Sequence, residues 1–229
     1  MKNLIYENFQ KSFKDLEKIK IHFLFSLVIF LFMVFIGLIL PIFFEEQILK
    51  MLEELLKLTE GLGFFSLTGF IIFNNIKSAF LGMIFGIFLA VVPLIVIIVN
   101  GYILGFVANK SIAIDGVLVL LRLFPHGIFE IPAVLISVSL GIKLGIDLMI
   151  NYLNYKKIDR VNIPIIVFLS ILFFPIAILV YLIFTFSNQK LRRIFFDNFI
   201  FSLRIFLFIV VPLLIIAGII EGGLIVFLG

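Results

Sequence analysis

Long stretches of this chain carry almost no charge. Val161–Gln189 contains no Asp, Glu, Lys or Arg, and Gly61–Asn109 contains Lys77 as its only charged residue. A helix needs about 20 mainly apolar residues to cross the hydrocarbon core of a bilayer. The whole chain is 63% hydrophobic and 14% charged, whereas soluble domains are about 45–50% apolar and about 25% charged. This composition excludes a soluble enzyme, a nucleic-acid-binding module and a disordered tail, and it predicts an all-α polytopic transmembrane bundle.

The apolar runs predict about five spans plus a broken or re-entrant helix. The five spans are Ile21–Phe43, Ile76–Val99, Gly116–Gly141, Val161–Gln189 and Phe199–Leu228. As one helix, Gly61–Asn109 would be roughly 70 Å long, about twice a bilayer, so it must break. We place the breaks at Asn74–Asn75 and Asn100–Gly101, because Asn and Gly are weak helix formers. Phe64–Phe73 then forms a short interfacial or re-entrant helix.

The segments between the runs set the expected orientation of this single integral membrane domain, residues 1–229. Residues 1–20 carry five lysines and lack the apolar core and cleavage site of a secretory signal. They predict a retained, amphipathic cytoplasmic segment. Residues 44–62 carry five glutamates against two lysines and predict an acidic, amphipathic extracytoplasmic loop. If Gly116–Gly141 crosses, Val161 lies outside, and if it re-enters, Val161 lies inside. The positive-inside count is equal for both, and we favour the crossing.

Ionisable residues within apolar stretches are the candidate functional groups, because each costs roughly 2.5–3.5 kcal/mol on insertion scales. Arg122, His126 and Glu130 follow one another at intervals of four, which would align them on one helical face. Pro125 and Gly127 lie between them. Proline favours the first turn of a helix, so we expect a break near Phe124 and a new helix from Pro125. A break at membrane depth requires packing in protein or a wet cavity.

Three roles compete for this cluster. In the structural one, Arg122 neutralises Glu130 and His126 satisfies backbone groups freed at the break. In the second, the three residues form a proton or ion relay, or a polar site for a lipid headgroup. In the third, His126 and Glu130 bind a metal with Glu221 as a further ligand. The chain has two histidines and no His-Glu-x-x-His pattern, so an intramembrane metalloprotease is poorly supported.

The remaining candidates have supporting roles. Glu221 is either a residue of the far interface or a partner of Arg122 or Lys77. Asn74, Asn75 and Asn100 are expected to form hydrogen bonds between helices. Close helix packing is predicted at three Gly-x-x-x-Gly pairs, which are Gly82/Gly86, Gly101/Gly105 and Gly141/Gly145.

Several motifs together resemble the stage II sporulation protein M family of membrane proteins. The most specific is the run Phe124-Pro125-His126-Gly127-Ile128-Phe129-Glu130-Ile131-Pro132-Ala133. The other elements are Asn74-Asn75, Asn100-Gly101-Tyr102-Ile103-Leu104-Gly105 and Ile220-Glu221-Gly222. Together they extend from about residue 65 to the end of the chain.

This resemblance implies a polytopic membrane protein without an established enzymatic activity of its own. The family's namesake anchors two peptidoglycan-degrading enzymes during engulfment in spore formers, and that role carries over only by analogy. We therefore predict a non-enzymatic scaffold in the cell membrane that binds membrane or cell-envelope proteins. A transporter or lipid-handling protein that uses the Arg122, His126 and Glu130 site is the alternative. We expect no cofactor, no metal and no nucleic acid, and a homo-oligomer is compatible with the sequence.

Overall fold

The structure is a computed structural model that describes residues 2–88, 90–155 and 174–228. Every regular element within these residues is helical. The elements are α1 (Lys2–Leu16), η1 (Glu17–Ile19), α2 (Lys20–Ile39), α3 (Glu45–Thr59), α4 (Phe64–Ile84), η2 (Phe85–Ile87), α5 (Val91–Asp115), η3 (Val117–Val119), α6 (Leu120–Tyr155), α8 (Phe174–Ser187), α9 (Gln189–Ile205), the π-helical turn η5 (Phe206–Val210) and α10 (Val211–Leu228).

Five helical stretches in the described chain are long and apolar enough to cross a membrane. They are Ile5–Ile39, Phe64–Ile87, Val91–Asp115, Gly127–Tyr155 and Gln189–Phe227. The expected all-α bundle of five spans is thereby confirmed, and α3 confirms the amphipathic helix that residues 44–62 predict.

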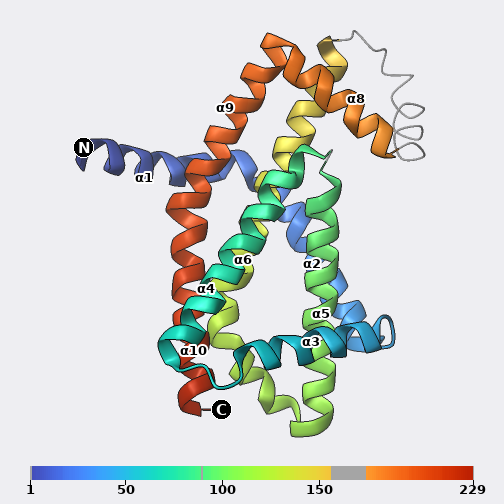
Figure 1. Ribbon diagram of the computed structural model, residues 1–229, viewed down its shortest axis with the longest axis vertical. Helices are drawn as coiled ribbons and strands as arrows, with labels where there is room; N and C mark the ends of the chain where they lie inside the picture. The colour runs from blue at the N-terminus through green and yellow to red at the C-terminus, as the bar shows by residue number, and fades with distance from the viewer. Residues whose placement is uncertain (1, 89, 156–173, 229) are drawn as a thin grey trace.

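The spans alternate in direction between two ends of the bundle (Figure 1). The α1 end holds α1, the last turns of α6 and the start of α9. The α3 end holds α3 and the C-terminus. α2, α5 and the α9–α10 stretch run from the α1 end towards the α3 end, and α4 and α6 run back. Helices α1 and α3 therefore lie across the bundle rather than along it.

The break in Gly61–Asn109 is real, but its predicted positions are wrong. Asn74 and Asn75 lie inside α4, and Asn100 and Gly101 lie inside α5. The chain instead turns through η2 and a left-handed residue, Ala90, with φ of 62°. The helical propensities of Asn and Gly differ from that of Ala by under about 1 kcal/mol each. Lipid makes unpaired backbone groups more costly than that, so helices continue through such residues.

The break expected at Phe124–Pro125 is also absent, since α6 continues through both Pro125 and Pro132. α6 begins at Leu120, which places Pro125 directly after the first turn. A proline at this position removes one backbone hydrogen bond of the helix. Prolines within membrane helices are tolerated where neighbouring helices satisfy the freed groups.

The predicted span Ile76–Val99 is wrong, because η2 and Ala90 divide it between α4 and α5. The expected short helix Phe64–Phe73 is the first half of α4. Residues 161–173 of the predicted span Val161–Gln189 lie outside the described residues, so this span stays a prediction, and residues 174–187 form α8. Residues 120–141 of the predicted span Gly116–Gly141 lie in α6, which continues past Gly141 to Tyr155. Lys143 and Asp147 form an ion pair one turn apart, so the polar residues after Gly141 do not end the helix. α6 therefore returns the chain to the α1 end rather than to the opposite end of the bundle (Figure 1).

Glycines hold two pairs of spans in close contact. Gly86 packs directly on the backbone of Gly141, and a Cβ at Gly141 would lie 2.6 Å from the carbonyl oxygen of Gly82. In the other pair, a Cβ at Gly101 of α5 would lie 2.8 Å from the carbonyl oxygen of Phe30 in α2. No side chain fits at such distances, so these contacts require glycine. The packing role predicted for the Gly-x-x-x-Gly pairs is confirmed.

Candidate functional site

The residues predicted to form the intramembrane site lie in the first half of α6, near the α3 end. Because α6 is continuous, positions 122, 126 and 130 follow one another on successive turns of one helix face. The side chains of Arg122 and His126 lie outside the described part of the chain. Glu130 is half-buried and has an interaction within the protein. Whether the three groups act together stays a prediction.

Glu221 lies on α10 near the α3 end and is half-buried. Its neighbour Gly222 packs directly on Thr68 in the first turns of α4. Lys77 follows Thr68 by nine residues, which is about 13 Å along the helix axis. Within the described chain, Glu221 and Lys77 form no ion pair with each other or with another residue. The position of Glu221 agrees with the interpretation that it lies near the far membrane interface.

The asparagines differ from expectation. Asn100 is exposed, and its amide donates to the carbonyl oxygen of Val96 in the same helix, at 2.7 Å. It therefore does not join two helices. On α4, Asn74 and Lys77 are exposed and Asn75 is half-buried. These three residues lie in the middle of a span rather than at a break.

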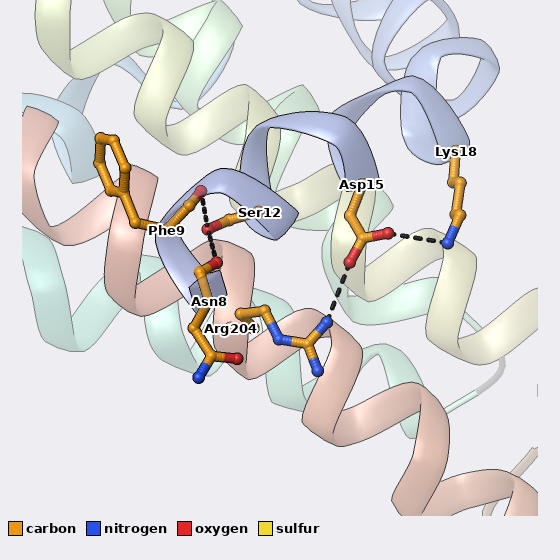
Figure 2. Close-up of polar contacts among 6 residues, drawn as sticks. All are labelled: Asn8, Phe9, Ser12, Asp15, Lys18 and Arg204. Atoms are coloured by element: carbon orange, nitrogen blue, oxygen red, sulfur yellow. Dashed lines mark hydrogen bonds and ion pairs between the residues drawn. The ribbon is translucent and has the colours of Figure 1, made fainter. Parts of the chain in front are cut away.

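A buried ion pair that the sequence did not predict lies at the α1 end (Figure 2). The Asp15 carboxylate accepts hydrogen bonds from the Arg204 guanidinium at 3.0 Å and from the Lys18 ammonium at 2.7 Å. The Asp15 side chain is 4% exposed and that of Arg204 is 17% exposed. Ser12, one turn before Asp15, is buried and donates to the backbone oxygens of Asn8 and Phe9. The pair fastens α1 to α9.

Further charged groups surround this pair. Lys18 and Lys143 lie over the ring of Phe201, at 5.6 Å and 5.7 Å from its centre. Lys143 also pairs with Asp147. Nearby, His22 has a buried Nδ1 atom that lacks a hydrogen-bond partner among the residues that the structure describes. We call Asp15, Lys18, His22, Lys143, Asp147 and Arg204 the inner polar cluster. Within it, the Asp15–Arg204 pair joins the α1 segment to α9, and Lys143 of α6 contacts α9 through the Phe201 ring.

A separate apolar pocket lies between α2, α3 and α5. Its volume is about 560 Å³, and its lining includes Met33, Ile36, Phe43, Ile48, Ile98 and Tyr102. The Tyr102 hydroxyl donates to the Leu40 carbonyl oxygen at 2.8 Å and accepts from the Phe43 N–H at 3.0 Å. Lys110 of α5 and Glu45 of α3 form an ion pair at 2.5 Å. These contacts hold α3 against the spans and keep the walls of the pocket in place.

Neither feature was visible in the sequence pattern. The Asp15–Arg204 pair joins residues 189 positions apart, and Asp15 lies in a lysine-rich segment that is typical of a solvated tail. One available signal was the presence of a single arginine, Arg204, in an apolar run, since such a charge needs a partner. The amphipathic pattern of residues 44–62 indicated a helix without indicating what it covers.

Comparison with known proteins places the chain among membrane proteins of one family. The family model described as "Stage II sporulation protein M" matches residues 26–224. An uncharacterised protein from Methanocaldococcus jannaschii is 40% identical over 83 residues, which cover 36% of this chain and 36% of that protein. The chain therefore matches about a third of this relative's length. No solved structure matches the chain.

Proposed function

The chain belongs to the stage II sporulation protein M family, and from this premise we propose that it is a non-enzymatic, multi-pass membrane scaffold that recruits other membrane or cell-envelope proteins. The connections between elements support this role. In the described chain, the longest connection between successive helices is the five residues 40–44. Such connections leave no room for a soluble catalytic domain within the described ranges.

The single observation that carries the proposal is the inner polar cluster. A reactive intramembrane site needs charged groups that remain available for substrate, and the charges of this cluster are engaged with one another. Asp15, Arg204 and Lys18 form one connected group, and Lys143 and Asp147 form another. Of these pairs, the buried Asp15–Arg204 pair joins two helices and fixes α1 against α9, which suits a rigid platform.

Isolation of the protein from native membranes in mild detergent tests the scaffold role. We expect the same partner to co-purify in repeated preparations, and we expect the purified chain alone to show no transport and no hydrolysis. Repeated isolation without a partner, after chemical cross-linking in the intact membrane, would overturn the scaffold role. Reconstituted flux that is lost in Glu130→Gln would favour the transporter alternative instead.

Charge supports an orientation with the α1 end in the cytoplasm. Residues 2–20 carry five lysines against three acidic residues, and α9 carries four basic residues against Asp197. Residues 44–62, at the α3 end, carry five glutamates against two lysines. Cytoplasmic segments of membrane proteins are enriched in Lys and Arg.

The absence of cysteine from the sequence allows this orientation to be tested on a clean background. We expect an impermeant maleimide to label Asn154→Cys and Ser187→Cys from the cytoplasmic side. Glu54→Cys, on the exposed face of α3, should react from the outside. Labelling of Asn154→Cys from the outside would contradict the direction of α6.

The apolar pocket favours a second candidate function, the binding of a lipid chain. The pocket lies against membrane spans, and its volume of about 560 Å³ suits one long hydrocarbon chain rather than a polar substrate. Native mass spectrometry of the protein in mild detergent should detect bound lipid. Ile98→Trp, which fills the pocket, should remove that lipid, whereas Phe32→Trp on the exposed face of α2 should not.

A further inference from the structure

One face of α4 is exposed and has an unusual composition for a lipid-facing surface. The exposed side chains of Phe65 and Leu81 lie at its two ends. The positions at helical spacing between them are Ser66, Gly69, Phe73, Asn74, Lys77 and Ser78, and all six are exposed. We call these six residues the α4 face. Lipid-facing helix surfaces are mainly large and apolar, whereas small and polar residues concentrate where one membrane helix packs on another. The composition of the α4 face is therefore typical of a helix–helix interface.

The opposite side of α4 is already packed. Leu67, Thr68 and Ile71 are buried. A Cβ at Gly218 of α10 would lie 2.5 Å from the Ile72 side chain, and Ser137 of α6 donates to the Ala79 carbonyl oxygen at 2.5 Å. α4 therefore has a fixed orientation, with α10 and α6 behind it (Figure 1). Its polar side cannot rotate inward without breaking these contacts.

Lys77 lies deep in the span. It lies thirteen positions after Phe64 and ten positions before Ile87, which correspond to roughly 20 Å and 15 Å along the helix axis. Within residues 2–88, 90–155 and 174–228, no ion pair or hydrogen bond of the Lys77 ammonium is found. A long lysine side chain can bend towards an interface, but the short side chains of Asn74 and Ser78 cannot follow it. The three adjacent polar groups thus need a partner at this depth.

We propose that the α4 face binds a transmembrane helix of another membrane protein that carries an Asp or Glu near the middle of the bilayer. The carboxylate of that helix accepts from the Lys77 ammonium, and Asn74 and Ser78 supply further hydrogen bonds. Gly69 and Ser66 allow the two backbones to approach closely. This inference rests on the proposed scaffold function and identifies the surface and the kind of partner.

A second copy of this chain fits the face less well. A two-fold symmetric contact through the α4 face brings each residue near its own equivalent, so two Lys77 ammonium groups would meet in lipid. An asymmetric contact needs an exposed carboxylate of the second copy at the depth of Lys77. Glu221 is half-buried, and its neighbour Gly222 packs on Thr68, which lies about 13 Å from Lys77 along the axis. Glu130 is half-buried and already has an interaction within the chain.

Model helices test the chemistry of the α4 face directly. Purified protein is placed in phosphatidylcholine vesicles with a Leu-Ala transmembrane helix of about 23 residues that carries Glu, Gln or Leu at its centre. We expect energy transfer to report binding of the Glu helix about tenfold tighter than binding of the Leu helix. Lys77→Met should remove the preference for Glu over Gln, whereas Lys77→Arg should keep it.

Lys57→Met is the matched control, because Lys57 is an exposed lysine on α3. It should leave the preference for the Glu helix unchanged. Equal binding of the three helices to the unmodified protein would overturn the inference. A preference for Glu that survives in Lys77→Met would also overturn it.

Cross-linking in native membranes separates this inference from the scaffold proposal. A photoreactive residue at Ser78 should capture the co-purifying partner, and one at Phe32 on the exposed face of α2 should not. If the partner co-purifies equally with the Lys77→Met variant, and photoreactive residues capture it only outside the α4 face, the proposed role of this face is overturned. The scaffold role would stand in that case. A disulfide between two copies of Ser78→Cys would assign the face to self-association instead. Absence of any partner overturns the scaffold role, while the model-helix assay still reports on the face.

Discussion

Arg204 and Lys77 are both cations within apolar spans, but their surroundings are opposite. The Arg204 side chain is 17% exposed and pairs with the buried Asp15 carboxylate at 3.0 Å. Lys77 is exposed in the middle of α4, without an ion pair within the described residues. The difference shows that charged residues within spans can have different roles. Arg204 forms an ion pair inside the protein, whereas Lys77 is placed for an ion pair with a partner protein, as proposed above.

The largest effect is expected from breaking the Asp15–Arg204 pair. Asp15→Asn leaves the Arg204 guanidinium mostly buried without a counter-charge, which should lower the free energy of unfolding by about 3–5 kcal/mol. An SDS titration followed by circular dichroism measures this. The double variant Asp15→Asn/Arg204→Met should recover part of the loss. Lys57→Met breaks the exposed pair with Glu53 and should cost less than about 1 kcal/mol. Equal losses in Asp15→Asn and Lys57→Met would contradict the comparison.

Glycine substitutions test the same contrast between packed and exposed surroundings, at Gly86 and at Gly69. Gly86, in the turn after α4, lies directly on the Gly141 backbone, so Gly86→Ala should destabilise by about 1–3 kcal/mol. Gly69 has no neighbouring atom within 4 Å of an added Cβ, so Gly69→Ala should stabilise the helix by about 0.5–1 kcal/mol. Thermal unfolding of the two purified variants distinguishes them. A loss of stability in Gly69→Ala would show that its surroundings are not open.

Tyr102 provides an intermediate case, because its hydroxyl lies at the edge of the bundle with both hydrogen bonds made. Tyr102→Phe leaves the Phe43 N–H and the Leu40 carbonyl oxygen without this partner and should cost about 1 kcal/mol. Proteolysis should also cut residues 40–44 more rapidly than in the unmodified protein. Unchanged cleavage would indicate that the Lys110–Glu45 pair and the packing of Ile48 on Phe106 hold α3 without this hydroxyl.

The smallest effect on stability is expected at Lys77. Lys77→Met removes no contact made within the described chain and should change the free energy of unfolding by less than about 0.5 kcal/mol. The same SDS titration measures it. A loss comparable to that of Asp15→Asn would mean that Lys77 has a structural partner, and the contrast with Arg204 would no longer hold.

The number of spans could be predicted from the sequence because span length depends mainly on the run of apolar residues. The break after α4 could not be placed in the same way. It depends on Gly86 lying against Gly141 and on the left-handed backbone of Ala90, and both are tertiary features. Polar residues misled the prediction three times, at Asn74–Asn75, at Asn100–Gly101 and after Gly141. A helix in lipid keeps its backbone hydrogen bonds even where its side chains are polar.

The candidate site was predictable only in part. The positions of Glu130 and Glu221 within spans follow from the sequence, whereas the exposure of Lys77 depends on how α4 is rotated against α10. The Asp15–Arg204 pair was not predictable, because it requires α1 to fold back across the start of the last span. A segment rich in lysine gives no indication of such docking, and only the tertiary structure brings its acid to the arginine.

The π-helical turn η5, between α9 and α10, sets the relative orientation of two surfaces. These are the surface of α9 that faces α1 and the surface of α10 that packs on α4. A helix turns by about 100° per residue, so removing one residue from Phe206–Val210 would swing α10 by that angle relative to α9. Arg204 would still face α1, but Gly218 and Gly222 would turn away from α4. In this short segment the number of residues therefore matters more than their side chains. A one-residue deletion should disconnect the α1 end from the packing that orients the α4 face.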